Sequence, residues 1–235
     1  MRRLLPILLC WPLLVGAASR SFDGTNDEID WGDNFDIGPH MMACTWTKLT
    51  EDASTDWVTG HSSNLDDIAW SFSQTTSDVM QMRVEENIAS GGSINTGTCT
   101  TDIDGAWYFV CGSFNDDTSG AGCWVNGTQE GVDATNSLET VTNTDTFKHG
   151  EDGDNGNDAN GLMAYTQIER AFVVSAVLVT EMMWHPGCCS ALGFLTLWGD
   201  ATEINIQNTA VAGTVAGATT STDGPPVMIG GYLPL

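Results

Sequence analysis

One segment of the sequence, residues 149–160, holds an unusual density of side chains that could bind a metal ion. Its sequence is HGEDGDNGNDAN, with four carboxylates and three asparagines among three glycines. Calcium takes about six to eight oxygen ligands in a flexible geometry, which such a loop could supply. The spacing does not fit an EF-hand, because the twelfth position lacks a glutamate. The simplest alternative is a solvated loop whose Asp and Asn side chains only stabilise turns.

The histidines and cysteines offer no comparable pattern for catalysis. None of the four histidines, at positions 40, 61, 149 and 185, accompanies a G-x-S-x-G nucleophile motif. A zinc site has little support, because no C-x-x-C pair or histidine ladder accompanies the thiols. His185 is close to Cys188 but stands alone. We therefore predict no nucleophilic triad and no zinc site.

The beginning of the chain has the layout of a secretory signal peptide. Two arginines precede an apolar run over residues 4–18, in which Val15 and Ala17 fit the −3 and −1 positions of a cleavage site. The run is shorter than the roughly 20 residues of a membrane span, although an uncleaved anchor is the alternative. We predict a signal peptide over residues 1–17 and a secreted single domain over 18–235, with 200–235 as a C-terminal covering segment or tail.

The charge of the mature chain limits its partners. Removal of Arg2 and Arg3 leaves five basic residues against 31 acidic ones, a formal charge near −26. Nucleic acid and anionic membrane surfaces are poor partners for such a chain. The excess favours bound cations, neutral or cationic ligands, or simply a soluble surface.

The six cysteines outside the signal peptide predict disulfides, since the count is even and the chain is exported. We predict a Cys111–Cys123 bridge, because the two stand symmetrically about a turn and each lies in a strand-like run. Adjacent Cys188 and Cys189 cannot easily pair with each other. At least one of them is therefore expected to reach Cys44 or Cys99.

Short runs rich in Val, Ile, Thr and aromatic residues, separated by Gly, Asn, Asp and Ser, predict an all-β sandwich. One helix is expected at 175–184, and Asn126-Gly127 suits a tight hairpin turn. Three tryptophans, Trp46, Trp107 and Trp124, are expected to fill the space between the sheets. The predicted strands are 27–31, 41–48, 68–74, 79–85, 107–113, 122–125, 162–173 and 194–198.

Five fragments occur in the order found in laminin-G-like jelly rolls of the concanavalin A-like superfamily. The chain resembles these domains in RSFDGTNDEID at 20–30, CTWTK at 44–48, DGAWYFV at 104–110, CWVNG at 123–127, and GLMA at 161–164 leading to LVTEM at 178–182. The resemblance spans about 160 residues. It implies a two-sheet antiparallel jelly-roll sandwich with one short helix near the C-terminal third.

The acidic loop also resembles the calcium loop of pentraxins, a related sandwich family. On that resemblance Asp152 and Asp154 are calcium ligands, and Asp66 or Asp67 lies opposite them. The distal glutamine of that family has no clear counterpart here. Further ligand-binding candidates are the loop residues Asn155, Asn157 and Asp158 and two tryptophans expected to be exposed, Trp57 and Trp70.

Glu28-Ile29-Asp30 is similar to the Glu-Ile-Asp-x-Glu signature of retaining glucanases in the same superfamily. Those enzymes carry the two catalytic carboxylates on one strand face. Here Gly32 replaces the final glutamate, and Asp33 falls on the other face. We therefore expect no glucanase activity, and a glucanase-like hydrolase is kept as a remote alternative.

These observations predict a secreted, non-catalytic binding module that recognises glycans or a protein partner through rim loops, with calcium as a possible cofactor. The alternative is a structural subunit of an extracellular filament, surface layer or viral particle. In that case a flexible end over residues 214–235 could dock on a neighbour and form a homo-oligomer.

Overall fold

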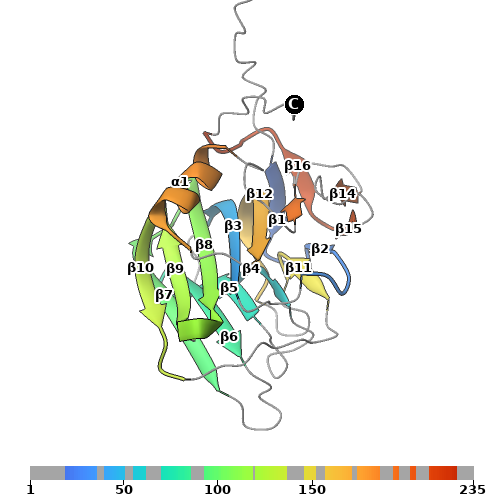
Figure 1. Ribbon diagram of the computed structural model, residues 1–235. Coiled ribbons are helices and arrows are strands. Elements are labelled where there is room, and N and C mark those ends of the chain that lie inside the picture. The colour runs from blue at the N-terminus through green and yellow to red at the C-terminus, as the bar shows by residue number, and fades with distance from the viewer. Residues whose placement is uncertain are drawn as a thin grey trace, which may run out of the picture.

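The described part of the chain folds into two antiparallel sheets with one α-helix on the outside, as predicted (Figure 1). The computed structural model describes residues 19–35, 40–50, 55–61, 70–85, 93–118, 120–136, 146–151, 157–170, 174–185, 193–195, 202–204 and 212–226. Sheet A has the order β10-β9-β8-β3-β12-β1-β16, with β13 paired to β12, and sheet B has the order β14-β15-β2-β11-β4-β5-β6-β7.

The strands of sheet A are β1 (Ser19–Asp23), β3 (His40–Leu49), β8 (Tyr108–Asn115), β9 (Gly120–Val125), β10 (Thr128–Asp133), β12 (Asn160–Arg170), β13 (Gly193–Leu195) and β16 (Thr219–Ser221). Those of sheet B are β2 (Glu28–Asp30), β4 (Asp56–His61), β5 (Trp70–Gln74), β6 (Val79–Glu85), β7 (Ile94–Asp102), β11 (Phe147–His149), β14 (Thr202–Ile204) and β15 (Ala212–Ala216). The Asn126-Gly127 turn joins β9 to β10 with positive φ at both residues, as expected for this dipeptide.

The space between the sheets is filled by residues that alternate along each strand. On β6, Met80, Met82 and Val84 point into the core, while Gln81 and Arg83 between them are partly exposed. The largest side chains of this core include Trp31, Trp70, Phe22, Phe72 and Phe147. This clustering of aromatic side chains is what holds the two sheets together.

The prediction that Trp46, Trp107 and Trp124 lie between the sheets is wrong. Trp46 and Trp124 belong to a second apolar cluster on the outer face of sheet A, and Trp107 packs against it. The reason is the register: Met41 and Ala43 face the inter-sheet core, so Met42, Cys44 and Trp46 must face outward.

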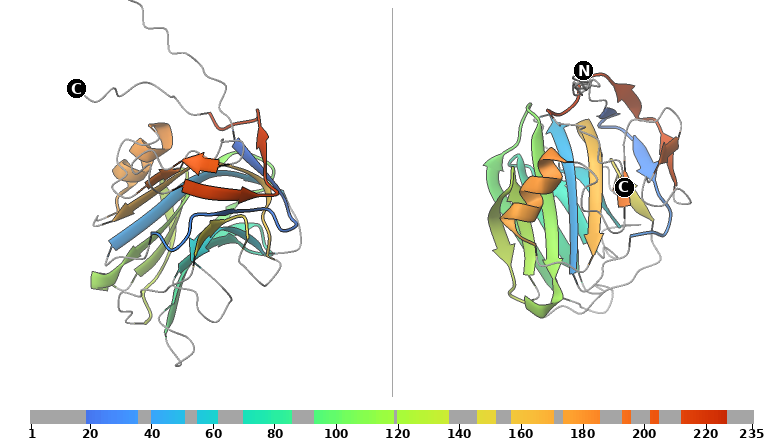
Figure 2. Two further views of the ribbon diagram at one scale, coloured as in Figure 1. Left: turned by 90° about the vertical axis from the view of Figure 1, so that its right-hand side faces the viewer. Right: turned by 45° about the horizontal axis from the view of Figure 1, so that its top comes forward.

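The helix α1 (Ala176–Trp184) covers this outer cluster (Figure 2, right). Its first turn is capped by Ser175, whose hydroxyl accepts a hydrogen bond from the Leu178 amide. Val179, Met182 and Met183 are buried against sheet A. No helix in the described part of the chain is long and apolar enough to cross a bilayer.

The disulfides differ from the predicted Cys111–Cys123 pair. Cys44 bonds to Cys111 across β3 and β8, and Cys99 bonds to Cys123 between the two sheets. In the β8–β9 register Gly112, not Cys111, lies opposite Cys123, so Cys111 and Cys123 point to opposite faces of sheet A. Because Cys44 and Cys99 are thus occupied, the predicted bridges from Cys188 or Cys189 to them are wrong as well. Cys188 and Cys189 lie outside the described residues.

Where β10 of sheet A lies beside β7 of sheet B, carboxylates of β10 accept hydrogen bonds from backbone amides of β7. Glu130 Oε2 accepts hydrogen bonds from the backbone amides of Thr100 and Thr101, both at 2.8 Å. Asp133 Oδ2 accepts one from the Thr96 amide at 2.9 Å. Because these amides have acceptors, the β7 edge is not free to pair with another strand.

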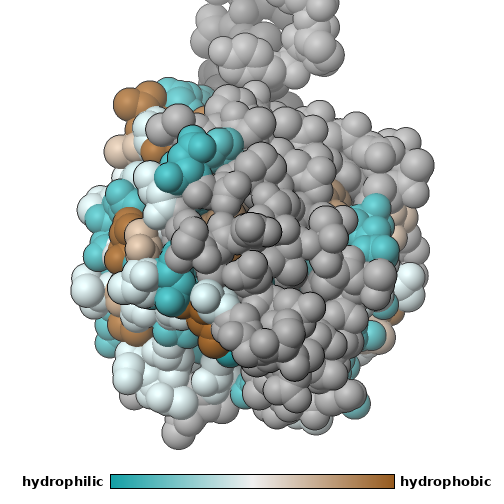
Figure 3. Space-filling model, turned by 60° about the horizontal axis from the view of Figure 1, so that its bottom comes forward, coloured by the Kyte–Doolittle hydropathy of each residue, from teal (hydrophilic) through white to brown (hydrophobic). Residues whose placement is uncertain are grey.

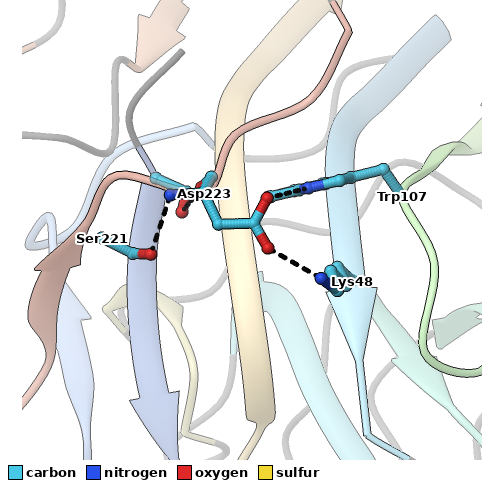
Figure 4. A network of polar contacts seen from close by, with 5 residues as sticks. Lys48, Trp107, Ser221 and Asp223 are labelled. Carbon is cyan, nitrogen blue, oxygen red and sulfur yellow. Dashed lines mark hydrogen bonds and ion pairs between the residues drawn. The ribbon is translucent and has the colours of Figure 1, made fainter. Parts of the chain in front are cut away.

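Residues 212–226 belong to the sandwich, so the expectation that this part is a flexible end is wrong, while its docking on a neighbour stays a prediction. β15 extends sheet B beside β2, and β16 extends sheet A beside β1. Beyond β16, Asp223 accepts hydrogen bonds from Lys48 Nζ at 2.7 Å and from Trp107 Nε1 at 3.0 Å (Figure 4). Its carbonyl accepts a hydrogen bond from the buried Ser19 hydroxyl at 2.5 Å. These bonds fasten the segment across the beginning of β1.

Candidate functional site

Charged side chains gather where β2 and β11 lie side by side in sheet B. Lys148 on β11 is in register with Asp30 on β2, and its Nζ lies 2.6 Å from Glu28 Oε2. Glu151 lies two residues after the end of β11 and shares a hydrogen bond with Glu28. We call Glu28, Asp30, Lys148 and Glu151 the acidic cluster. It brings three carboxylates and one ammonium to the edge of residues 152–156, which lie outside the described residues.

One carboxyl group of the acidic cluster, that of Glu151, has a pKa of about 7. Burial, the hydrogen bond with Glu28 and the negative charges of Glu28 and Asp158 raise the pKa of Glu151 to about 7, while Lys148 opposes this shift. Burial disfavours the charge on Lys148, but the Glu28 hydrogen bond and the surrounding carboxylates raise its pKa above the usual value. A cation placed among these carboxylates would favour the charged form of Glu151 and so oppose the effects of burial and of the neighbouring negative charges on its pKa.

A second group of carboxylates lies on the turn between β1 and β2. Asp27 Oδ2 accepts a hydrogen bond from the Asp23 amide at 2.8 Å, and Asp158 Oδ2 accepts one from the Asn26 amide at 2.9 Å. Burial and the charges of Asp23 and Asp158 raise the pKa of Asp27, against the lowering effect of the Asp23 amide. Two of these carboxylates thus accept backbone hydrogen bonds that stabilise the turn.

Behind the acidic cluster, a chain of buried hydrogen bonds crosses the sandwich. Trp31 Nε1 donates to His149 Nδ1 at 3.0 Å, so the neutral ring carries its proton on Nε2. That nitrogen lies 2.8 Å from Thr166 Oγ1, which donates to Thr45 Oγ1 at 3.0 Å. Complete burial lowers the pKa of His149 to about 3. The chain links β11 of sheet B to β12 and β3 of sheet A.

The structure tests only part of the predicted site. Trp57 and Trp70 are 3% and 0% exposed, so the prediction that they are exposed is wrong. Both lie within strands of sheet B rather than in polar loops, and neither is available to stack on a sugar. Asp66, Asp67, Asp152, Asp154 and Asn155 lie outside the described residues. Among the described residues, no three His, Cys, Asp or Glu side chains are arranged to hold a metal ion.

Two predicted loop residues are described. The carbonyl of Asn157 accepts a hydrogen bond from the Trp57 amide at 2.8 Å, and the Asp158 carboxylate supports the β1–β2 turn. The sequence reasoning missed Lys148, Glu151 and His149 as partners of these groups. Alternation could have indicated that Lys148 faces outward between two buried neighbours, but nothing in the sequence indicates which strand lies beside β11.

No protein-family model matches the sequence, and no curated protein matches it. Solved structures do resemble it. The native heptameric SAP-like pentraxin from Limulus polyphemus has a TM-score of 0.55 and 14% identity over 86% of this chain and 96% of that one. A "putative carbohydrate binding protein" from Bacteroides ovatus has a TM-score of 0.65 and 15% identity over 91% of this chain. This chain spans 62% of the length of that second protein.

At these identities the likeness concerns the fold. The chain has a two-sheet antiparallel jelly-roll fold, and the fold expected from the resemblance to laminin-G-like domains is confirmed.

Proposed function

We propose that this protein is exported and acts outside the cell as a non-catalytic module that binds glycans or a protein partner through the loops beside the acidic cluster. The observation that carries this proposal is the crowding of Glu28, Asp30 and Glu151 around the paired strands β2 and β11. The disulfides fit an oxidising compartment. The Bacteroides neighbour, described as a carbohydrate binding protein, supports the choice of a glycan.

Calcium is the cofactor that suits this edge. Asp152 and Asp154 lie one and three positions after Glu151 in the sequence, so they would extend a group of carboxylates that already repel one another. With Asp66 or Asp67 they would supply the oxygen ligands that calcium prefers. Bound calcium would add the positive charge that Lys148 alone provides among the described residues of the acidic cluster.

Thermal unfolding with calcium and with a chelator tests the ion. At a calcium concentration about 100 times the dissociation constant, binding to the folded state alone adds about 2.7 kcal/mol. For a chain of this length, that raises the melting temperature by roughly 5–11 °C. The double variant Asp152→Ala with Asp154→Ala should lose this shift. A matched control, Asp33→Ala with Asp117→Ala, removes the same charge from two exposed positions and should keep it. An unchanged melting temperature in the wild type would contradict the calcium proposal.

A glycan array with and without calcium tests the ligand. We expect binding to neutral or cationic glycans rather than anionic ones, because the chain carries a formal charge of −24. Binding that resists both chelation and the Asp152/Asp154 double variant would show that the acidic edge is not the binding site.

A structural subunit is the second candidate, because the pentraxin neighbour is heptameric. Size-exclusion chromatography over a range of concentrations distinguishes the two, since a building block assembles and an isolated binder stays monomeric. A glucanase is a remote alternative. The Glu28 and Glu151 carboxyl groups share a hydrogen bond, whereas retaining glycosidases keep theirs about 5–5.5 Å apart around the scissile bond. Hydrolysis of a β-glucan that disappears in Glu28→Gln would reverse this assignment.

A further inference from the structure

A hollow of about 120 Å³ lies on the outer face of sheet A, over β8, β9 and β10 and beside Val174. Its floor contains Gly120 and Gly122, alternate residues of β9 that face outward because Ala121 and Cys123 face the core. A Cβ atom on Gly122 would come within 2.5 Å of Ser113 Oγ, and one on Gly120 within 3.2 Å of Thr118 Oγ1. The hollow therefore exists because β9 carries glycine at two successive outward positions.

The side chains that line the hollow are uncharged, although the chain is strongly acidic. Hydroxyl and amide groups come from Ser113, Asn115, Thr118 and Gln129. Trp124 Nε1 donates to Ser113 Oγ at 3.2 Å, which leaves the Ser113 hydroxyl hydrogen for an acceptor. In the wall, Asn115 Oδ1 is buried without a hydrogen-bond partner in the described part of the chain. A ligand that both donates and accepts hydrogen bonds would match this lining.

Apolar side chains are exposed on the same side of the molecule. Within the described residues, the exposed large hydrophobic side chains are Val132 on β10 and Val177 and Trp184 on α1, at 59%, 73% and 39%. Figure 3 shows hydrophobic patches among hydrophilic residues on its left side, where α1 and β10 lie in Figure 1. Of these three side chains, Val132 lines the hollow itself, and an exposed apolar side chain beside polar groups in a hollow is typical of a recognition surface.

We propose that this hollow binds the acetamido group of an N-acetylated sugar. An acetamido group is neutral, donates through its N–H, accepts through its carbonyl oxygen and ends in a methyl group. The amides of Asn115 and Gln129 and the Ser113 hydroxyl match its polar part, and Val132 and Val174 match its methyl group. A volume of about 120 Å³ equals about four waters, and it is well below the roughly 300 Å³ of the smallest usual ligand pockets. The hollow thus accepts a substituent, while the sugar ring stays outside.

The hollow and the acidic cluster are separate sites. The hollow belongs to sheet A, whereas Glu28 and Lys148 belong to sheet B. None of the described residues that line the hollow carries a carboxylate, so we expect binding there without calcium.

Saturation-transfer NMR with the unmodified protein tests the proposal, with N-acetylglucosamine as the probe and glucose as the matched ligand without the acetamido group. The acetyl methyl protons should receive the strongest saturation, and glucose should bind at least fivefold more weakly. Chelation of calcium should change neither result. Gln129→Leu removes an exposed amide, and Gly120→Ala places a methyl group on the floor. Each should weaken N-acetylglucosamine binding about fivefold, the loss expected for one hydrogen bond or a filled contact.

Thr128→Val is the matched control, because Thr128 neighbours Gln129 on β10, is exposed and does not line the hollow. It should bind as the wild type does. Equal binding of glucose and N-acetylglucosamine would overturn the proposal, and so would wild-type affinity in both Gln129→Leu and Gly120→Ala. Binding lost on chelation or in the Asp152/Asp154 double variant, but kept in Gln129→Leu, would assign the sugar to the acidic edge instead. A peptide amide that competes more than tenfold better than N-acetylglucosamine would replace the sugar by a protein partner.

Discussion

The buried His149 should make the protein unstable in mild acid, and the size of this effect follows from its surroundings. Its pKa is about 3 in the folded protein and about 6.5 in the unfolded chain, because the ring is completely buried. Below pH 6.5 the unfolded chain takes up a proton that the folded protein cannot accept. The free energy of unfolding therefore falls by about 1.4 kcal/mol per pH unit between pH 6.5 and 3. From pH 7 to pH 4.5 the loss from His149 alone is about 2.5 kcal/mol.

Urea unfolding of the wild type and of His149→Gln at several pH values between 7 and 4.5 measures this effect. Glutamine can accept from Trp31 and donate to Thr166, but it does not titrate, so the difference between the two proteins should shrink by about 2.5 kcal/mol over this range. Subtracting the free energy of unfolding of His149→Gln from that of the wild type also cancels the contribution of Glu151, which both proteins contain. With its pKa raised to about 7, the Glu151 carboxyl stabilises the fold below pH 4.5 and loses that contribution as the pH rises through 7.

Two further variants make the experiment decisive. Thr166→Val removes the partner of His149 Nε2 and should lower stability by about 1–3 kcal/mol while keeping the wild-type pH slope, because the ring is still buried and neutral. Thr45→Val, which removes the acceptor of the Thr166 hydroxyl and leaves the ring buried, should likewise keep the wild-type slope. A difference between wild type and His149→Gln that stays constant from pH 7 to 4.5 would refute the reasoning.

Three other changes have expected outcomes. Replacing the Cys99–Cys123 pair by serines should lower stability by roughly 3.5 kcal/mol in denaturant titrations, since the bridge closes a loop with a sequence separation of 24, and the wild type under reducing conditions should show at least this loss. Glu130→Ala should cost about 2–3 kcal/mol and promote concentration-dependent association, because two β7 amides lose a charged acceptor; unchanged stability would contradict that role. Asp223→Asn should cost less than about 1 kcal/mol yet speed proteolysis after residue 212, and equal cleavage rates would show that its bonds to Lys48 and Trp107 do not fasten the segment.

The sequence was sufficient for properties that depend on neighbours along the chain. Runs of strand-forming residues predicted β3 and β6, and the helix expected at 175–184 matches α1 to within one residue. The Asn126-Gly127 hairpin follows from the positive φ angles that these residues tolerate. All of these features are set by local conformational preference or by a period of two or 3.6 residues.

Properties that depend on which strands lie side by side could not be predicted from the sequence. Cys111 and Cys123 lie one register step apart across β8 and β9, and that single step sends them to opposite faces. Trp46 lies under a helix rather than between the sheets, because its face of β3 is decided by where α1 returns, far along the chain. The acidic cluster likewise depends on the pairing of β2 with β11, whose residues are more than 100 positions apart.

The link between the core and the acidic cluster passes through a single residue. Gly150 separates the buried His149 from the partly exposed Glu151, with a φ of +88° that L side chains rarely adopt. A Cβ atom there would lie 2.4 Å from the Phe22 ring, so glycine is required by space as well as by conformation. His149 is held in place by Trp31 and Thr166. The position of the Glu151 backbone beside Glu28 is therefore set by the core.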